Sequence, residues 1–211
     1  MTAVPQLECF FDCSSPWTYL GFHNIQPLAA ALGVEITWRP ILVGGLFNTI
    51  NPSVYHSREF PVPVKQTYMH KDLQNWADLA GIKISWPMTI FPINSVKAMR
   101  GCIAASRQGK LVPYAQGVFE AYWGQDRDIT QDELLAAIAT AAGLDPDEMA
   151  RAMATDEIKG ELRQNTEELA QRGGFGSPTF FVNNGDGRDD MYFGNDRMPL
   201  IHSALRAALT A

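Results

Sequence analysis

The 211-residue sequence has only three cysteines, Cys9, Cys13 and Cys102, and no two of them form a C-x-x-C pair. A thiol–disulfide oxidoreductase needs a resolving cysteine for exchange, so this absence weighs heavily against that class. The cysteine spacing is also unlike that of a metal site, and we expect no bound metal. An odd number of thiols is typical of a cytoplasmic protein with free cysteines, which is the location we expect.

The sequence also lacks any apolar run near the ~20 residues that cross a bilayer. Residues 1–6 show no basic start followed by an apolar core, so we expect no secretory signal. A net charge of −6 gives no general electrostatic reason to bind nucleic acid or an anionic membrane, and we expect neither partner. The sequence does contain 46% hydrophobic and 19% charged residues, which is typical of a folded globular protein.

The chain opens with a strand–helix–strand pattern. Residues 7–11 form a short β-prone run, and Pro16 suits the first turn of a helix because its missing N–H costs nothing there. Gly33 ends the helical spacing of apolar residues, and residues 34–38 give a second strand. This order predicts a parallel pair of strands with a right-handed crossover.

The middle of the chain has a different pattern. Residues 44–63 are rich in Gly, Asn, Pro and Ser, which predicts a long functional loop. Thr130 with Glu133 forms a capping box, and Asp145 before Pro146 gives another helix start. We predict helices over residues 65–80, 95–108, 112–123, 130–143, from 145 onward, and 155–172.

The C-terminal part returns to β structure. We predict a strand at 179–182, a turn at 183–187, a second strand at 190–193 and a final helix at 198–209. The whole order is βαβ, then helices, then ββα. This order predicts an α/β fold whose two halves are separated by an all-helical insertion.

The first candidate site is the Ser14-Ser15-Pro16 segment, between the first strand and the first helix. The unpaired N–H groups and dipole of a helix N-terminus stabilise a thiolate, and a serine hydroxyl adds a charge-assisted hydrogen bond. Together these effects would lower a thiol pKa by about 1–3 units. Taken alone, the segment is more often a plain helix cap.

The second candidate is the Ser177-Pro178 pair, at the start of a strand after a glycine-rich approach. A cis bond here would turn the Ser177 backbone outward, so that it could pair with an extended peptide. Only ~5–6% of X–Pro bonds are cis in folded proteins, so the residues alone favour an ordinary trans proline.

Two further segments carry polar residues that suit a peptide. Asn195 and Asp196 precede the last helix, where free N–H groups suit a carboxylate and Asp196 suits an ammonium group. In the predicted loop, Lys65 would supply a cation for a carboxylate, and Asn51 would hydrogen-bond a peptide. The simpler interpretations are a helix cap with a solvated pair, and a solvated lysine.

In five segments the sequence resembles the 2-hydroxychromene-2-carboxylate isomerases. These enzymes group with kappa-class glutathione transferases in the thioredoxin-like group that includes bacterial disulfide oxidoreductases. The segments cover residues 10–21, 39–47, 63–72, 176–179 and 193–197. The resemblance implies a thioredoxin-like domain formed by residues 1–45 and 174–211, a helical insertion domain over 46–173, and a homodimer.

The resemblance also implies a role for each candidate residue. Ser15, with Ser14 as the weaker candidate, would face the sulfur of glutathione, and Ser177-Pro178 would pair with its cysteinyl part. Asn195 and Asp196 would hold the γ-glutamyl end. Lys65 and Asn51 would contact the glycine or γ-glutamyl ends.

The implied reaction is a cis–trans isomerisation of an aromatic substrate, 2-hydroxychromene-2-carboxylate, to trans-o-hydroxybenzylidenepyruvate. Glutathione thiolate adds to a conjugated C=C bond, the resulting single bond rotates, and elimination restores the alkene. The sequence departs from the family at Asn48, where many relatives carry lysine, at Ser177, where an aliphatic residue is frequent, and over residues 50–61. These departures concern the substrate more than glutathione binding.

Three other functions stay open. They are a kappa-like glutathione transferase or peroxidase acting on another electrophile, a thiol–disulfide oxidoreductase, and a non-catalytic module that binds glutathione or a peptide. Trp17, Phe47 and Trp86 would suit an apolar wall for a second substrate, although core packing is the commoner role of such aromatic residues.

Overall fold

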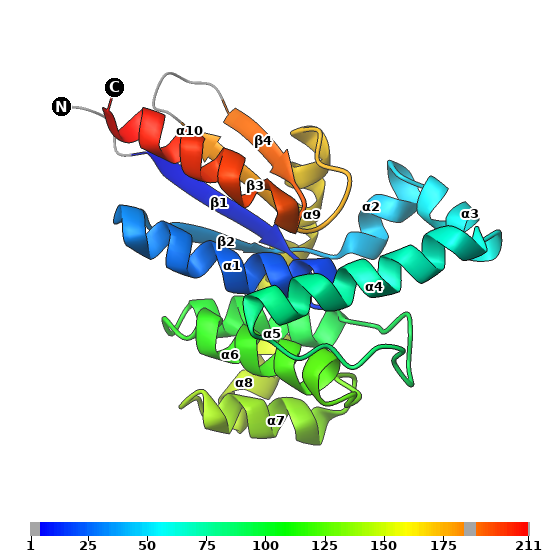
Figure 1. The fold of residues 1–211 in the computed structure, drawn as a ribbon. Coiled ribbons are helices and arrows are strands. Elements are labelled where there is room, and N and C mark those ends of the chain that lie inside the picture. Colours follow the sequence, from blue (N-terminus) through cyan, green and yellow to red (C-terminus); the bar gives the residue numbers. More distant parts are fainter. Residues whose placement is uncertain (1–4, 184–188, 211) are drawn as a thin grey trace.

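The computed structural model describes residues 5–183 and 189–210, and a four-stranded sheet forms its centre (Figure 1). The strands are β1 (Gln6–Phe11), β2 (Ile36–Pro40), β3 (Thr179–Asn183) and β4 (Asp189–Phe193), in the order β2-β1-β3-β4. β1 pairs parallel with β2, whereas the β1–β3 and β3–β4 pairs are antiparallel. The predicted parallel opening pair and the returning hairpin strands are therefore confirmed.

The described part of the chain contains ten α-helices. They are α1 (Pro16–Leu32), α2 (Val43–Thr49), α3 (Ser53–Glu59), α4 (Pro63–Ala80), α5 (Val96–Ser106), α6 (Leu111–Phe119), α7 (Asp132–Ala141), α8 (Pro146–Met153), α9 (Asp156–Gln171) and α10 (Met198–Thr210). Helices α2 to α9 follow β2 and precede β3, so the predicted thioredoxin-like βαβ…ββα fold with a helical insertion is confirmed. The domain boundaries at 45/46 and 173/174 stay a prediction.

The two faces of the sheet are covered by different helices. Strand residues alternate in direction, so Leu7, Cys9 and Phe11 join the core with α1 and α10, whereas Phe10 faces the other way. Phe10 forms a second cluster with Leu169 of α9 and with Ile41, Leu46 and Phe181. The sheet is thus covered by helices on both faces, which buries its apolar residues.

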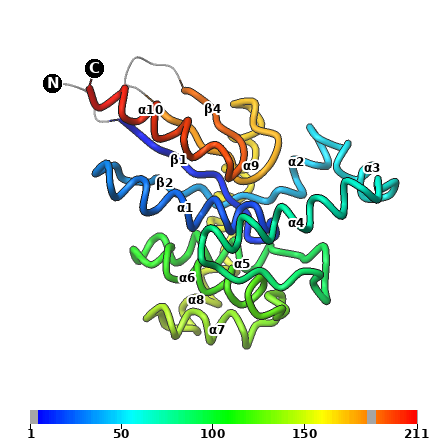
Figure 2. Tube along the Cα trace, viewed as in Figure 1, coloured from blue at the N-terminus to red at the C-terminus, as the bar shows by residue number. Residues whose placement is uncertain are grey.

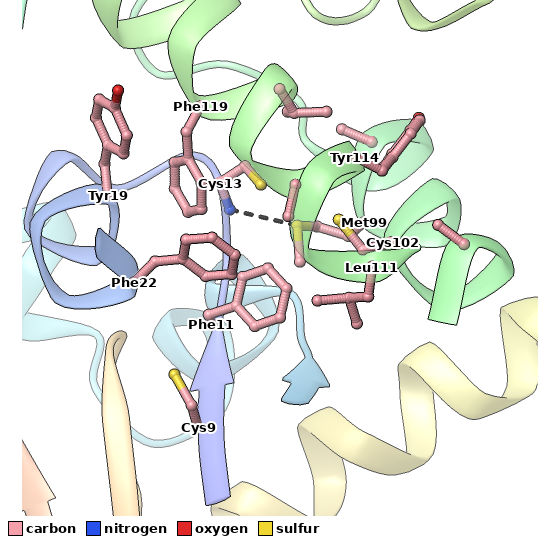
Figure 3. Close-up of a cluster of buried hydrophobic side chains, with 14 of the residues drawn as sticks. Cys9, Phe11, Cys13, Tyr19, Phe22, Met99, Cys102, Leu111, Tyr114 and Phe119 are labelled. Atoms are coloured by element: carbon pink, nitrogen blue, oxygen red, sulfur yellow. Dashed lines mark hydrogen bonds between the residues drawn. The ribbon is translucent and has the colours of Figure 1, made fainter. Parts of the chain in front are cut away.

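A continuous core connects the sheet to the helical part (Figure 3). In that core Phe11 and Phe22 pack against Phe119, with ring centroids 6.3 and 5.2 Å away. The backbone N–H of Cys13 donates to the sulfur of Met99 at 3.3 Å. The end of β1 and the start of α1 are therefore held in place by contacts with helices of the insertion.

The segment between β2 and α4 corrects one prediction. Residues 44–63 are not a long loop, because they form most of α2 and all of α3 and lead into α4. These helices project to one side of the sheet, and α4 then runs back beside α1 (Figures 1 and 2). Asn51, Pro52 and Pro61 lie in the short connections here, whereas Gly44 and Gly45 lie within α2. Each of the two helices has only seven residues.

Other local predictions have mixed outcomes. Asp145 caps α8 as predicted, by accepting from the N–H groups of Asp147 and Glu148. The capping box at Thr130 is wrong, because Gln131 is the cap of α7 and the Thr130 hydroxyl donates to Asp128. The helix predicted over 112–123 changes at residue 120 into a π-helix, Glu120–Gly124. The predicted turn at 183–187 lies mostly outside the described residues.

Among the helices of residues 5–183 and 189–210, none is long and apolar enough to cross a membrane.

Candidate functional site

A cavity of about 1080 Å³ opens beside the start of α1. Its walls come from the N-terminus of α1, from α2 to α4, from the segment before α5 and from the turn before β3. The wall includes four of the predicted site residues: Ser15, Asn51, Lys65 and Ser177. Residues that lie far apart in the sequence therefore meet around one space.

Ser15 is the N-cap of α1 and also borders the cavity. Its extended backbone (φ −113°, ψ 127°) precedes Pro16 at the first helical position, and its Oγ accepts from the Thr18 N–H at 3.3 Å. The neighbouring Ser14 borders the cavity as well, while its N–H donates to Asp12 at 2.9 Å. The capping role and the site role are thus compatible, since a hydroxyl that accepts from Thr18 can still donate its own proton.

The Ser177-Pro178 peptide bond is cis, the isomer that the residues alone did not favour. The Ser177 Oγ accepts from the Asp12 N–H at 3.0 Å and lies 2.8 Å from Thr18 Oγ1. The backbone N–H and C=O of Ser177 have no hydrogen-bond partner within the described residues. These two groups are the donor and the acceptor with which an incoming extended peptide would pair.

Asp12, which the sequence analysis missed, connects several walls of the cavity. It follows β1 directly and is only 1% exposed. Its two carboxylate oxygens accept from the N–H of Ser14 at 2.9 Å and of Val43 at 2.8 Å. Burial raises the pKa of Asp12, and the hydrogen bonds from Ser14, Val43 and Ser95 oppose that rise. An acidic residue at the end of an apolar strand was the signal available in the sequence.

Asn51 and Lys65 approach the cavity differently. The Asn51 side chain donates to the Phe175 carbonyl at 3.3 Å and accepts from the Ser53 hydroxyl at 2.5 Å. It therefore joins the α2–α3 connection to the turn before β3. Lys65 lies in the first turn of α4, is exposed, and makes no ion pair with another described residue. Its charge is available to an anionic ligand.

Pro178, Asn195 and Asp196 do not line the cavity, although Phe193 close by does. Asn195 is 3% exposed, and its Oδ1 accepts from the Asn24 amide at 2.8 Å. The Nδ2 of Asn195 is buried and has no partner in the described parts of the chain. Asp196 is half exposed and pairs with Arg197 at 3.0 Å. Both residues lie at the short 3₁₀ turn before α10, which packs against α1.

Aromatic side chains form much of the remaining wall. Trp17, Phe47 and Trp86 all line the cavity, and Trp17 and Trp86 also pack against the core, so both interpretations of these residues hold in part. Arg58, missed in the sequence because its segment was expected to be a loop, lies over Phe47 at 5.7 Å and over Phe91 at 5.5 Å. Asn48 accepts from the Tyr55 hydroxyl at 2.8 Å.

Comparisons with known proteins agree with this architecture. The sequence profile of the family described as DsbA-like thioredoxin domain matches residues 6–206. Glutathione S-transferase kappa 2 of Caenorhabditis elegans is 27% identical, with 92% of this chain and 89% of the relative covered. The 2-hydroxychromene-2-carboxylate isomerase of Pseudomonas putida is also 27% identical, covering 94% and 93%. A solved structure of such an isomerase superposes with a TM-score of 0.80 at 26% identity, covering 95% of this chain and 94% of that structure.

Proposed function

The chain belongs to the DsbA-like thioredoxin family, and we propose that it is a glutathione-dependent isomerase in which Ser15 stabilises the thiolate. The observation that carries the proposal is the placement of Ser15 and the cis Ser177-Pro178 turn, which brings both serines to the wall of one cavity. The relatives named as isomerases and kappa transferases support the same chemistry.

The residues present fit glutathione as a ligand. The unpartnered N–H and C=O of Ser177 suit the cysteinyl peptide unit. The exposed Lys65 would hold the glycine carboxylate, and Asn51 would contribute a polar contact on the same side. At the other end, Asp196 would hold the ammonium group of the γ-glutamyl part, and Asn195 beside it would contribute a polar contact at the same turn.

When bound, glutathione supplies a thiolate whose reversible addition to a conjugated C=C bond allows rotation about that bond. The Ser15 hydroxyl would donate a hydrogen bond to the sulfur, which is worth about 1.5–3 kcal/mol for a charged acceptor. The positive end of the α1 dipole adds about 0.3–1 kcal/mol. Together they favour ionisation of the thiol by roughly 1–3 pKa units, so that no cysteine of the chain is needed.

The rest of the cavity suits an aromatic substrate that carries an anionic group. Trp86 and Phe91 stand with ring centroids 4.9 Å apart, which gives an apolar wall for a planar ring. Arg58 makes no ion pair within residues 5–183 and 189–210, so its guanidinium can receive a carboxylate or an enolate. We propose 2-hydroxychromene-2-carboxylate as the substrate to test first.

The direct test is to follow conversion of 2-hydroxychromene-2-carboxylate to its trans isomer with and without glutathione. We expect turnover that requires glutathione and leaves its concentration unchanged. Turnover without glutathione, or none with it, would rule the isomerase out. Consumption of glutathione with an unrelated electrophile would instead support the alternative of a kappa-like transferase or peroxidase, which the Caenorhabditis elegans relative favours. Binding without any turnover would indicate a non-catalytic module.

We further propose that the protein is a cytoplasmic homodimer. The three described thiols are free and buried, which suits a reducing compartment. Val64 and Tyr68 on α4 are 76% and 64% exposed, and such apolar residues are candidates for a subunit interface. Sedimentation of the purified protein at micromolar concentration tests the dimer, and a single monomeric species would contradict it.

A further inference from the structure

A second, smaller pocket of about 260 Å³ lies between α5, α9 and the start of α2. Its lining includes three cationic side chains, Arg100, Lys159 and Arg163. The other lining residues are neutral: Leu42, Gly45, Leu162 and Thr166. We call these seven residues the cationic pocket. A hollow with three cations and no acid is unexpected in a chain that carries 17 basic and 23 acidic residues.

The three cations are poorly compensated within the protein. Lys159 pairs at 3.1 Å only with Asp156, whose side chain is fully exposed, and such surface pairs contribute little. Arg100 and Arg163 make no ion pair with any residue that the structure describes. The Nε of Arg100 is buried and has no hydrogen-bond partner there. The pocket therefore carries positive charge that acidic residues of the described chain compensate only through Asp156.

The spacing along α9 adds a second reason. Lys159 and Arg163 are four residues apart, so their like charges lie one turn apart on the same helix face. Like charges at this spacing repel and destabilise a helix. The hydroxyl of Thr166, one turn further, is already engaged, because it accepts from the Leu42 N–H at 3.0 Å and donates to the Leu162 carbonyl at 2.8 Å. The neighbouring α5 then contributes Arg100 from the opposite wall.

We propose that the cationic pocket binds a phosphate group, either as the free ion or as a small phosphomonoester. Arginine presents a planar fork of donors that matches phosphate oxygens, and lysine adds a point charge. The volume is sufficient for a phosphate group with a short organic tail. Leu42 and Gly45 line both this pocket and the large cavity, so the two sites are separate but share a wall.

The test is calorimetric titration of the full chain with inorganic phosphate and, separately, with glycerol 3-phosphate, at an ionic strength held constant with chloride. We expect saturable binding of at least one of them, and the tighter one identifies the source of the phosphate group. Arg163→Gln should weaken binding at least about fivefold, because one charge-assisted contact is lost. Arg151→Gln, which removes an exposed arginine of α8 outside both cavities, should leave binding unchanged.

Lys65→Gln distinguishes this pocket from the large cavity. If phosphate occupies the cationic pocket, the Lys65 variant binds it normally and excess glutathione does not displace it. Loss of phosphate binding in Lys65→Gln, equal binding by Arg163→Gln and the parent, or no saturable binding of either compound would overturn the proposal. Arg163 is exposed, so its replacement should leave the fold intact, which circular dichroism checks directly.

Discussion

The hydroxyl of Thr18 lies 2.8 Å from the hydroxyl of Ser177, so the first turn of α1 is connected directly to the cis-proline turn. Thr18 is fully buried, and Ser177 also accepts from the Asp12 N–H at 3.0 Å. The two segments that would hold the cysteinyl part of glutathione are therefore positioned by each other. This relationship makes the site a property of the fold rather than of either segment alone.

Replacing Thr18 by valine should loosen that connection with little change in shape. We expect a loss of about 1 kcal/mol in the free energy of unfolding, because one buried hydrogen bond is removed. Glutathione should also bind more weakly, by a few-fold, since Ser177 loses an orienting partner. Thr140→Val, at an exposed hydroxyl of α7, is the matched control in denaturant titrations and binding assays. Equal glutathione affinity in both variants would contradict the positioning role.

Gly21 should be intolerant of a side chain. A Cβ atom at this position would lie 2.7 Å from the Pro178 ring, so Gly21→Ala should push α1 away from the cis-proline turn. We expect a destabilisation of about 1–3 kcal/mol and reduced activity, as for other overpacked sites. Gly160→Ala, in α9 with nothing within 4 Å, should instead stabilise by roughly 0.5–1 kcal/mol. Thermal unfolding compares the two, and the same sign for both would contradict the packing argument.

Asp12 should affect how stability depends on pH. Because burial raises the pKa of Asp12, its carboxyl keeps a proton to a higher pH in the folded chain than in the unfolded chain, where it titrates at about 4. Stability should therefore fall as pH rises from there through the raised pKa. In Asp12→Asn this contribution disappears, so the free energy of unfolding should decline less steeply over that range. Parallel pH profiles for the two proteins would show that the Asp12 proton is not retained on folding.

Asp196 should contribute to glutathione affinity more than to stability. Its carboxylate is half exposed, so its pair with Arg197 contributes little to folding. We expect Asp196→Asn to raise the dissociation constant of glutathione several-fold, through loss of a charge-assisted contact. Asp132 on α7 is a comparable exposed carboxylate, paired with Lys97 of α5, and Asp132→Asn should leave glutathione affinity unchanged. An unchanged constant in Asp196→Asn would remove this residue from the site.

The sequence predicted the sheet and most helices because their signals are local. Ser15, Pro16 and Gly33 start and end α1 as expected, and the alternation in β1 identifies its buried residues. The helices α2 and α3 were missed because each has only seven residues and a composition typical of loops. Such helices depend on tertiary contacts, which no local pattern reveals.

The candidate site was only partly predictable for the same reason. Ser177 was named from the proline that follows it, but its hydrogen bonds with Asp12 and Thr18 span more than 150 residues of sequence. Arg58 enters the cavity wall only because α2 and α3 form, so its role had no local signal. The sequence placed Asn195 before the last helix, as the structure does, but its role in the site stays a prediction. Its hydrogen bond with Asn24 spans 171 residues of sequence, so no local pattern could reveal it.

The most direct measurement of the central claim is the pKa of the glutathione thiol when bound, read from the ultraviolet absorbance of the thiolate as pH is varied. For the parent protein we predict a value about 1–3 units below that of the free thiol. Ser15→Ala should raise the pKa of the bound thiol by about 1 unit or more. Thr155→Ala removes the equivalent cap of α9 at a similar cost of ~1 kcal/mol in stability, and it should leave that pKa unchanged. A bound thiol with the same pKa in the parent and in Ser15→Ala would contradict the account.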